Sequence, residues 1–207
     1  LVYRTIKDEA TQHAALRTGK LDILEAVRWT AVDNLKKSAP HLQWSRWLGM
    51  SGTFLAMRVD QKPFGDIRVR RALNMAVNKP EIVKAYYGGN AELFAYPMHP
   101  DYHGYFEPLD RMPASVKELF TYDPARAKKL LADAGYPGGF TVKVQVCSCS
   151  LDHMDLLPLV AGYLEKVGVK LELQPMEYGA FLSAMTTKTH AAAYFMNNGH
   201  TNPTTSI

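Results

Sequence analysis

The stretch Pro63-Phe64-Gly65-Asp66-Ile67-Arg68-Val69-Arg70-Arg71-Ala72-Leu73 carries the strongest structural pattern in the chain. From here on, apolar residues recur at spacings of three and four, the period of one helix face. They are Val69, Ala72, Leu73, Ala76 and Val77. Asp66 stands just before that face, where its carboxylate can accept from the free amides of a first turn. The stretch therefore predicts a helix capped by Asp66, with its arginines mostly in solvent.

A second helix start follows directly. Asn78 is a capping residue, Pro80 suits the first helical turn, and Glu81 is an acid three positions after the cap. Apolar residues then continue from 82 to 86, until Gly88-Gly89 ends the pattern. The sequence predicts two helices that meet at a capped elbow.

A third capped helix is predicted between Tyr122 and Tyr136. Asp123 is its N-cap, Pro124 occupies the first helical position, and Gly135 provides a left-handed stop. The apolar stripe between them consists of Ala127, Leu130, Leu131 and Ala134.

The rest of the chain predicts an α/β fold. Apolar alternation or short apolar runs indicate strands at 1–6, 23–27, 41–48, 54–59, 140–146, 169–173 and 191–196. Helical periodicity indicates helices at 8–17, 31–38 and 178–185, and another from about Asp152 or Asp155 to Val167. Pro158 fits best in the first turn if Asp155 is the cap. Beyond residue 139, strands and helices alternate, which predicts a mostly parallel sheet with flanking helices.

The opening stretch resembles the motif of the family 5 extracellular solute-binding proteins, the peptide- and nickel-type receptors of ABC importers. That family shows a proline, a phenylalanine, an acid and an R-V-R-x-A-L run before an alanine-rich helix. The matching positions here are Pro63, Phe64, Asp66, Arg68, Val69, Arg70, Ala72 and Leu73. The run from Tyr122 to Tyr136 resembles the family's Y-D-P-x-x-A-x-x-L-L-x-x-A-G-Y pattern, and Ala14 to Ile23 resembles another of its phrases.

The resemblance implies a two-lobed receptor that closes over its solute by hinge motion and then docks on a membrane permease. Residues 1–48 are expected to be the C-terminal part of lobe I, a β-α-β segment. Residues 49–207 are expected to form most of lobe II, truncated before the chain returns to lobe I. Since the sequence lacks an initiator methionine and opens on an apparent strand, we expect a fragment without its signal segment. The family works in the periplasm or outside the cell, free or held by a lipid anchor.

The solute site is expected at two stretches by which strands meet the cleft between lobes. These are Met50, Ser51, Gly52, Thr53 and Phe54, and then Asn197, Asn198, Gly199, His200 and Thr201. Relatives usually carry a tryptophan and then an aspartate at the second stretch, and peptide-binding members hold the solute's ammonium with that aspartate. Here Pro203 matches, Asn197 or Asn198 takes the place of the tryptophan, and the stretch contains no acid. Neutral groups cannot supply that charge pairing, so we expect a polar or uncharged solute, or a peptide held differently.

Two alternatives rest on cysteine and histidine. Cys147, Cys149 and His153 follow a predicted strand and could ligate a metal or a metal chelate, or act as a thiol nucleophile. His99 and His103 are four apart, but the neighbouring proline and glycine argue against the helix that such a metal pair needs. A bridge between the two cysteines is expected to be strained. With neither a G-x-S-x-G elbow nor a phosphate loop, the sequence predicts no catalytic residue, no metal and no cofactor.

Composition fits a soluble globular protein of one or two domains. The 207 residues are 47% hydrophobic and 21% charged, with a formal net charge of +4. Lysines and arginines are scattered among acids, which argues against nucleic acid as a partner. The expected partners are a small-molecule or peptide solute and the permease subunits, and the expected state is a monomer. A scaffold or chaperone-like module, the remaining class, would instead expose an apolar patch.

Overall fold

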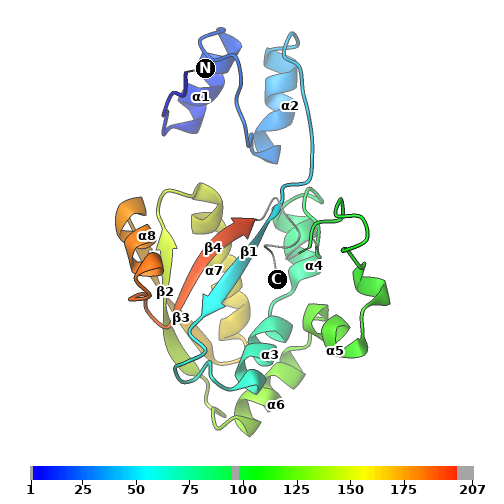
Figure 1. Ribbon diagram of the computed structural model, residues 1–207, viewed down its shortest axis with the longest axis vertical. Coiled ribbons are helices and arrows are strands. Elements are labelled where there is room, and N and C mark those ends of the chain that lie inside the picture. Colours follow the sequence, from blue (N-terminus) through cyan, green and yellow to red (C-terminus); the bar gives the residue numbers. More distant parts are fainter. Residues whose placement is uncertain (1, 95–97, 200–207) are drawn as a thin grey trace.

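The computed structural model describes residues 2–94 and 98–199, and its centre is a four-stranded sheet in the order β1-β4-β2-β3 (Figure 1). The strands are β1 (Ser51–Met57), β2 (Phe140–Cys147), β3 (Val169–Met176) and β4 (Ala193–Gly199). β2 runs parallel to both β3 and β4, whereas β1 is antiparallel to β4. The α/β class and the mostly parallel sheet are confirmed.

Helices cover both faces of this sheet. Tyr194 packs edge-on against Phe181 of α8 (Tyr178–Thr186), and the next residue, Phe195, packs edge-on against His153 of α7 (Leu151–Glu165). Because successive residues of a strand point to opposite faces, α7 and α8 lie on opposite sides of the sheet. The core between the sheet and the α7 layer includes the fully buried side chains Phe64, Val69, Leu131, Val144, Val146, Leu157 and Val169.

The opening stretch folds as its pattern predicts. The helix α3 (Ile67–Ala76) begins after Asp66, whose Oδ1 accepts from the backbone N–H of Arg68 at 2.8 Å. Val69, Ala72, Leu73 and Ala76 are buried. The apolar stripe therefore faces the core, and the cap fixes where the chain turns into the helix.

The two other predicted caps are also confirmed. Asn78 accepts from the N–H of Glu81 at 3.2 Å, ahead of the short α4 (Lys79–Glu81) and the π-helical turn η1 (Ile82–Tyr86). Asp123 accepts from the N–H of Arg126 at 2.9 Å at the start of α6 (Pro124–Asp133). α6 packs against α3, so both signature motifs belong to one layer of scaffold.

The long connection before α6 contains three short helical turns: η2 (Leu109–Arg111), α5 (Ala114–Lys117) and η3 (Glu118–Phe120). In the described part of this connection His99 is buried, and its Nε2 lies 3.2 Å from the carbonyl oxygen of Leu48. His103 is exposed. The two histidines therefore do not share an environment, and His99 ties the connection to the chain segment that leads into β1.

The β-α-β segment expected for residues 1–48 is wrong. Within residues 2–48 the structure has two helices, α1 (Glu9–Arg17) and α2 (Trp29–Ser38), and no strand at 2–6, 23–27 or 41–48. A strand needs a neighbour for its backbone groups and cover for its apolar side chains. Neither is present here, since Val2, Ile23 and Trp47 are 81%, 71% and 68% exposed. Figure 1 shows α1 and α2 beyond the edge of the sheet where β1 begins.

Of the two predicted starts of α7, Asp152 lies next to the observed first residue, Leu151, and Asp155 is wrong. α7 begins after Ser150, whose Oγ accepts from the N–H of His153 at 3.3 Å, and Pro158 lies inside the helix. Pro158 is exposed, so its ring meets solvent rather than a packed neighbour. The cap and the buried face of α7 outweigh the hydrogen bond that a mid-helix proline removes. No helix in the described part of the chain is long and apolar enough to span a membrane.

Candidate solute-binding site

The two stretches predicted to contact solute lie side by side. On the antiparallel pair β1 and β4, Thr53 is opposite Asn197, Gly52 is opposite Asn198 and Ser51 is opposite Gly199. These residues are the first of β1 and the last of β4, so they lie at the same end of the sheet. In Figure 1 this end faces α1 and α2. Met50 comes just before β1 and is 42% exposed. His200 and Thr201 lie outside the described residues.

A pocket of ≈ 590 Å³ opens beside β1. Its volume falls within the range of about 300–1,000 Å³ usual for small-molecule sites. Four of the predicted residues line it, namely Ser51, Gly52, Thr53 and Phe54. Met50 and Asn197 are not among its lining residues, and Asn197 is exposed. The structure thus joins the predicted stretches through strand pairing. The first stretch borders the pocket, whereas Asn197, the residue of the second whose side chain is described, does not.

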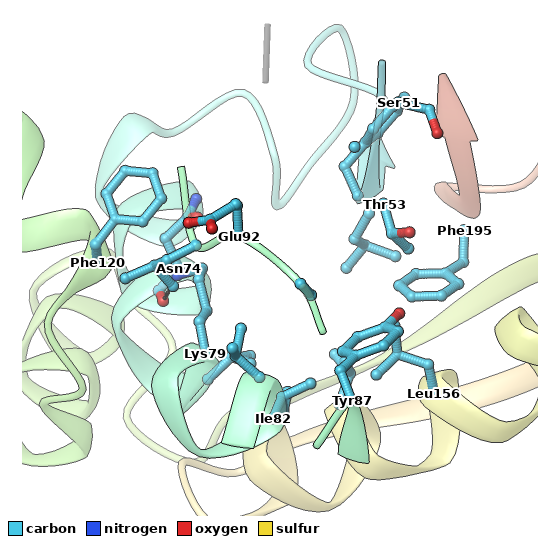
Figure 2. Close-up of a pocket in the computed structure, with 18 of the residues that line it drawn as sticks. Ser51, Thr53, Asn74, Lys79, Ile82, Tyr87, Glu92, Phe120, Leu156 and Phe195 are labelled. Atoms are coloured by element: carbon cyan, nitrogen blue, oxygen red, sulfur yellow. Dashed lines mark hydrogen bonds between the residues drawn. The ribbon is translucent and has the colours of Figure 1, made fainter. Parts of the chain in front are cut away.

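The pocket has an apolar wall and a more polar one. Figure 2 shows Thr53, Tyr87, Leu156 and Phe195 on one side, and Asn74, Lys79, Glu92 and Phe120 on the other. Leucine, valine and isoleucine side chains of α3, η1 and α7 add to the apolar lining, namely Leu73, Ile82, Val83, Val160 and Leu164. A mostly apolar pocket with a few polar groups can hold an organic solute and fix its orientation.

Lys79 is the charged group that sequence reasoning missed. Its Nζ donates to the carbonyl oxygens of Asn74 (2.6 Å) and Leu119 (2.8 Å) and lies 5.4 Å from the centre of the Phe120 ring. Burial lowers the pKa of Lys79 to about 8, because the charged form loses hydration. Among the described residues no carboxylate forms an ion pair with it. In the sequence Lys79 is one residue of a helix start, and only the folded chain brings the two carbonyls to it.

A polar cluster joins the segment around Arg28 to the start of α7. Both oxygens of Asp152 accept from tyrosines: Oδ1 from the hydroxyl of Tyr86 at 2.9 Å and Oδ2 from that of Tyr87 at 3.0 Å. Burial, together with the neighbouring Asp152, raises the pKa of Tyr86 to about 12 and also raises the pKa of Tyr87. Arg28 completes the cluster by donating to Asp155 at 2.7 Å and to the Tyr86 hydroxyl at 3.3 Å.

Cys147 and Cys149 form a disulfide. The turn that follows β2 brings the two sulfurs together, and Ser148 anchors it by donating its N–H and its Oγ–H to the carbonyl of Met176 at 2.9 and 3.0 Å. In this state neither sulfur is a thiolate ligand or a nucleophile.

The third member of that predicted group, His153, belongs to the core. It is 6% exposed and packs edge-on against Phe195, and burial lowers its pKa. Within residues 2–94 and 98–199, no group of three or more His, Cys, Asp or Glu side chains is placed to hold a metal ion. The metal and thiol-nucleophile interpretations therefore gain no geometric support from this turn.

An open α/β sheet with helices on both faces, and with two chain segments meeting at one edge, defines a periplasmic-binding-protein-like lobe. Residues 1–206 match the model of the bacterial extracellular solute-binding proteins, family 5 (middle region), and the chain belongs to this family. The family consists of solute-binding proteins rather than enzymes, and they act in the periplasm or outside the cell.

Similar proteins bind several solutes. A di/tripeptide-binding protein of Pseudomonas aeruginosa is 29% identical over 196 residues, which is 93% of this chain and 35% of that protein. A glutathione-binding protein of Escherichia coli is 28% identical over 179 residues, 86% of this chain and 33% of its own length. A heme-binding protein of Haemophilus influenzae is 29% identical over 174 residues, 82% of this chain and 30% of its own.

Among solved structures, the periplasmic binding protein DppA of Helicobacter pylori, in complex with the peptide STSA, superposes with a TM-score of 0.81. The two are 26% identical, and the match covers 95% of this chain and 36% of DppA. The chain thus spans about a third of the length of the relatives it matches.

Proposed function

We propose that this chain is part of the solute receptor of an ABC importer, which captures a peptide-like or other small polar solute and delivers it to a membrane permease. The observation that carries the proposal is the pairing of Thr53 with Asn197 at the edge of the sheet, beside the pocket that Ser51 to Phe54 line. In open α/β sheets, ligands bind beyond the carboxyl ends of the strands, and the end of β4 at Asn197 is such a place.

The solute we favour is a short peptide whose amino terminus is not held by an acid on β4. Relatives that bind di/tripeptides and glutathione support the peptide class. The described end of β4, residues 197–199, carries no carboxylate. An amide can accept a hydrogen bond from an ammonium group but does not neutralise its charge. Blocking the peptide's amine should therefore cost this receptor little affinity.

The division into lobes is part of the proposal. Residues 1–48 would belong to lobe I and residues 49–207 to lobe II, with the hinge where the chain passes from Leu48 into β1. The separation of α1 and α2 from the sheet supports this boundary. The carbonyl oxygen of Leu48, 3.2 Å from Nε2 of the buried His99, would then lie at the hinge itself.

Calorimetry on the full-length protein tests the function. Di- and tripeptides should bind, and their N-acetylated forms should bind with similar Kd values. Thr53→Ala should weaken binding about three- to tenfold, the cost of roughly one lost hydrogen bond. Thr141→Ala, on the exposed face of β2, is the matched control and should leave binding unchanged. If neither peptides nor other polar solutes bind, or if a free amine proves essential, the proposal fails.

The isolated piece 1–207 is expected to bind solute weakly or not at all, because it supplies only one side of the cleft. Micromolar binding by this piece would contradict the two-lobe arrangement. We also propose a monomer that acts outside the cytoplasm without catalysis, in contact with permease subunits and not with nucleic acid. Light scattering and membrane fractionation of the full-length protein test the oligomeric state and the proposed lipid anchor.

A further inference from the structure

The disulfide at the end of β2 joins a shielded sulfur to an accessible one. Cys147 is 4% exposed, whereas Cys149 is exposed. The two residues are separated by Ser148 alone, so the bridge closes a very short loop. An incoming thiolate can reach the Cys149 side of the bond more easily than the Cys147 side. Access of this kind largely decides which sulfur of a disulfide is attacked.

The buried sulfur, Sγ of Cys147, is suited to act as the leaving group when a thiolate attacks the disulfide. Sγ of Cys147 accepts a hydrogen bond from the backbone N–H of Cys149 at 3.2 Å. A donor aimed at this sulfur favours its thiolate form and so offsets part of the cost of burial. Ser148 and Ser150 hold the turn on both sides of Cys149, through the carbonyl of Met176 and the N–H of His153. The loop therefore keeps its shape if the bond opens.

The disulfide also lies at the same end of the sheet as the two predicted solute-binding stretches. Val146 is paired with Phe195, so Cys147 follows immediately beside the part of β4 that continues into Asn197. Asn197 in turn faces Thr53 on β1. A molecule held at the ends of β1 and β4 is thus next to the turn that carries Cys149.

We propose that the Cys147–Cys149 disulfide is a thiol-exchange site that takes up low-molecular-weight thiols, thiol-containing peptides included, at Cys149. The thiolate of the small molecule attacks Sγ of Cys149 and forms a new S–S bond. The old bond breaks, its electron pair leaves with Sγ of Cys147, and that thiolate takes up the proton lost by the small thiol. No external oxidant is consumed, because one disulfide replaces another.

The exchange is reversible within the same loop. Cys147 remains beside the mixed disulfide and can attack Cys149 again, which re-forms the bridge and releases the small thiol. This chemistry goes beyond the proposed transport function, since it requires neither hinge closure nor a permease. It needs only an accessible Cys149 with Cys147 behind it.

Mass spectrometry of the full-length protein tests the proposal. The protein is incubated with millimolar reduced glutathione, quenched in acid and analysed as intact protein and as peptides without reduction. We expect an adduct of one glutathione on Cys149, with Cys147 as a free thiol. S-methylglutathione, which lacks the thiol, is the matched ligand control and should leave the mass unchanged. An intact disulfide without adduct, or an adduct on Cys147, overturns the proposal.

A pair of variants checks the assigned roles. Cys147→Ala leaves Cys149 as a single exposed thiol, and Cys149→Ala leaves Cys147 as a single buried one. With oxidised glutathione the first variant should form the mixed disulfide at least about tenfold faster than the second, because accessibility limits the reaction. Equal rates contradict the assignment. The wild-type measurement decides the question even if one variant does not fold.

Discussion

The guanidinium of Arg28 lies 2.7 Å from the carboxylate of Asp155, and so ties the segment before α2 to helix α7, 127 positions along the chain. Trp29 adds a second contact, since a Cβ placed on Gly88 would lie 3.0 Å from its ring. Both side chains of the ion pair are partly exposed, at 33% and 50%. The pair therefore guides the placement of the N-terminal segment more than it stabilises the fold.

Arg28→Ala should loosen the N-terminal segment with little effect on global stability. We expect the unfolding free energy to fall by less than about 1 kcal/mol, the usual contribution of an exposed pair. Limited proteolysis between residues 39 and 50 should become several-fold faster. Arg17→Ala is the control, because the contact of Arg17 with Ser38 lies within the segment. Unchanged cleavage in the Arg28 variant would contradict this role of the ion pair.

Lys79 should make stability rise with pH. The pKa of Lys79 is about 8 in the folded chain against 10.5 in the unfolded one, so between these values the unfolded state binds more protons. From pH 7.5 to pH 9.5 the unfolding free energy should rise by roughly 2 kcal/mol from this group. Lys79→Met should flatten the rise, as urea unfolding at the two pH values can show. An equal slope in both proteins would contradict a buried Lys79.

The tyrosines set the upper limit of that pH range. The pKa values of Tyr86 and Tyr163 are raised to about 12, so an unfolded chain loses these protons first as the pH passes 10. From there the folded state binds more protons, and stability falls with rising pH. Measurements below pH 9.5 keep this opposite effect away from the Lys79 slope.

Gly139 should not tolerate a side chain. Its φ is +75°, and a Cβ there would collide with the carbonyl group of Gly168 at the start of β3. Gly139→Ala should lower the unfolding free energy by about 3 kcal/mol or more, through strain and displacement of β3. Gly138→Ala, with open space at its Cβ, is the matched control. Thermal unfolding compares the two, and similar midpoints would contradict the close approach.

Asn197→Asp should convert the receptor towards recognition of an amino terminus. A carboxylate opposite Thr53 would pair with the ammonium of a peptide, a gain we set at about three- to tenfold because the position is exposed. N-acetylated peptides should gain nothing, and Asn197→Gln should behave as the wild type. Calorimetry of the full-length variants measures both. Equal gains for blocked and free peptides would argue against a charge effect.

Local signals predicted the helices well. Asp66, Asn78 and Asp123 act within one turn of their own position, so their capping can be read from the sequence alone. The same local logic favoured Asp155 over Asp152 as the start of α7, and it failed there, because the buried face of α7 favours a start directly after Ser150 in spite of Pro158. The strand predicted at 23–27 failed because strands depend on neighbours that the pattern cannot supply.

Less of the candidate site than of the fold could be predicted from the sequence. The stretches around Thr53 and Asn197 were each chosen for their positions along the chain, and their direct pairing appears only in the folded sheet. Lys79 gives no local signal, because its partners are carbonyls 5 and 40 positions away. The bridge between Cys147 and Cys149 depends on how Ser148 is held by β3, which spacing alone does not reveal.

The chain enters the sheet through the start of β1 and leaves it through the end of β4, and these two passages are hydrogen-bonded to each other. In a two-lobed receptor, the backbone that bends during closure would then be the same ladder that borders the solute. A solute bound there would make the hinge itself more rigid. Solute binding could then act on lobe closure directly, without a chain of side-chain contacts between the site and the hinge. Solute binding and lobe closure would both act on the same two strands, β1 and β4.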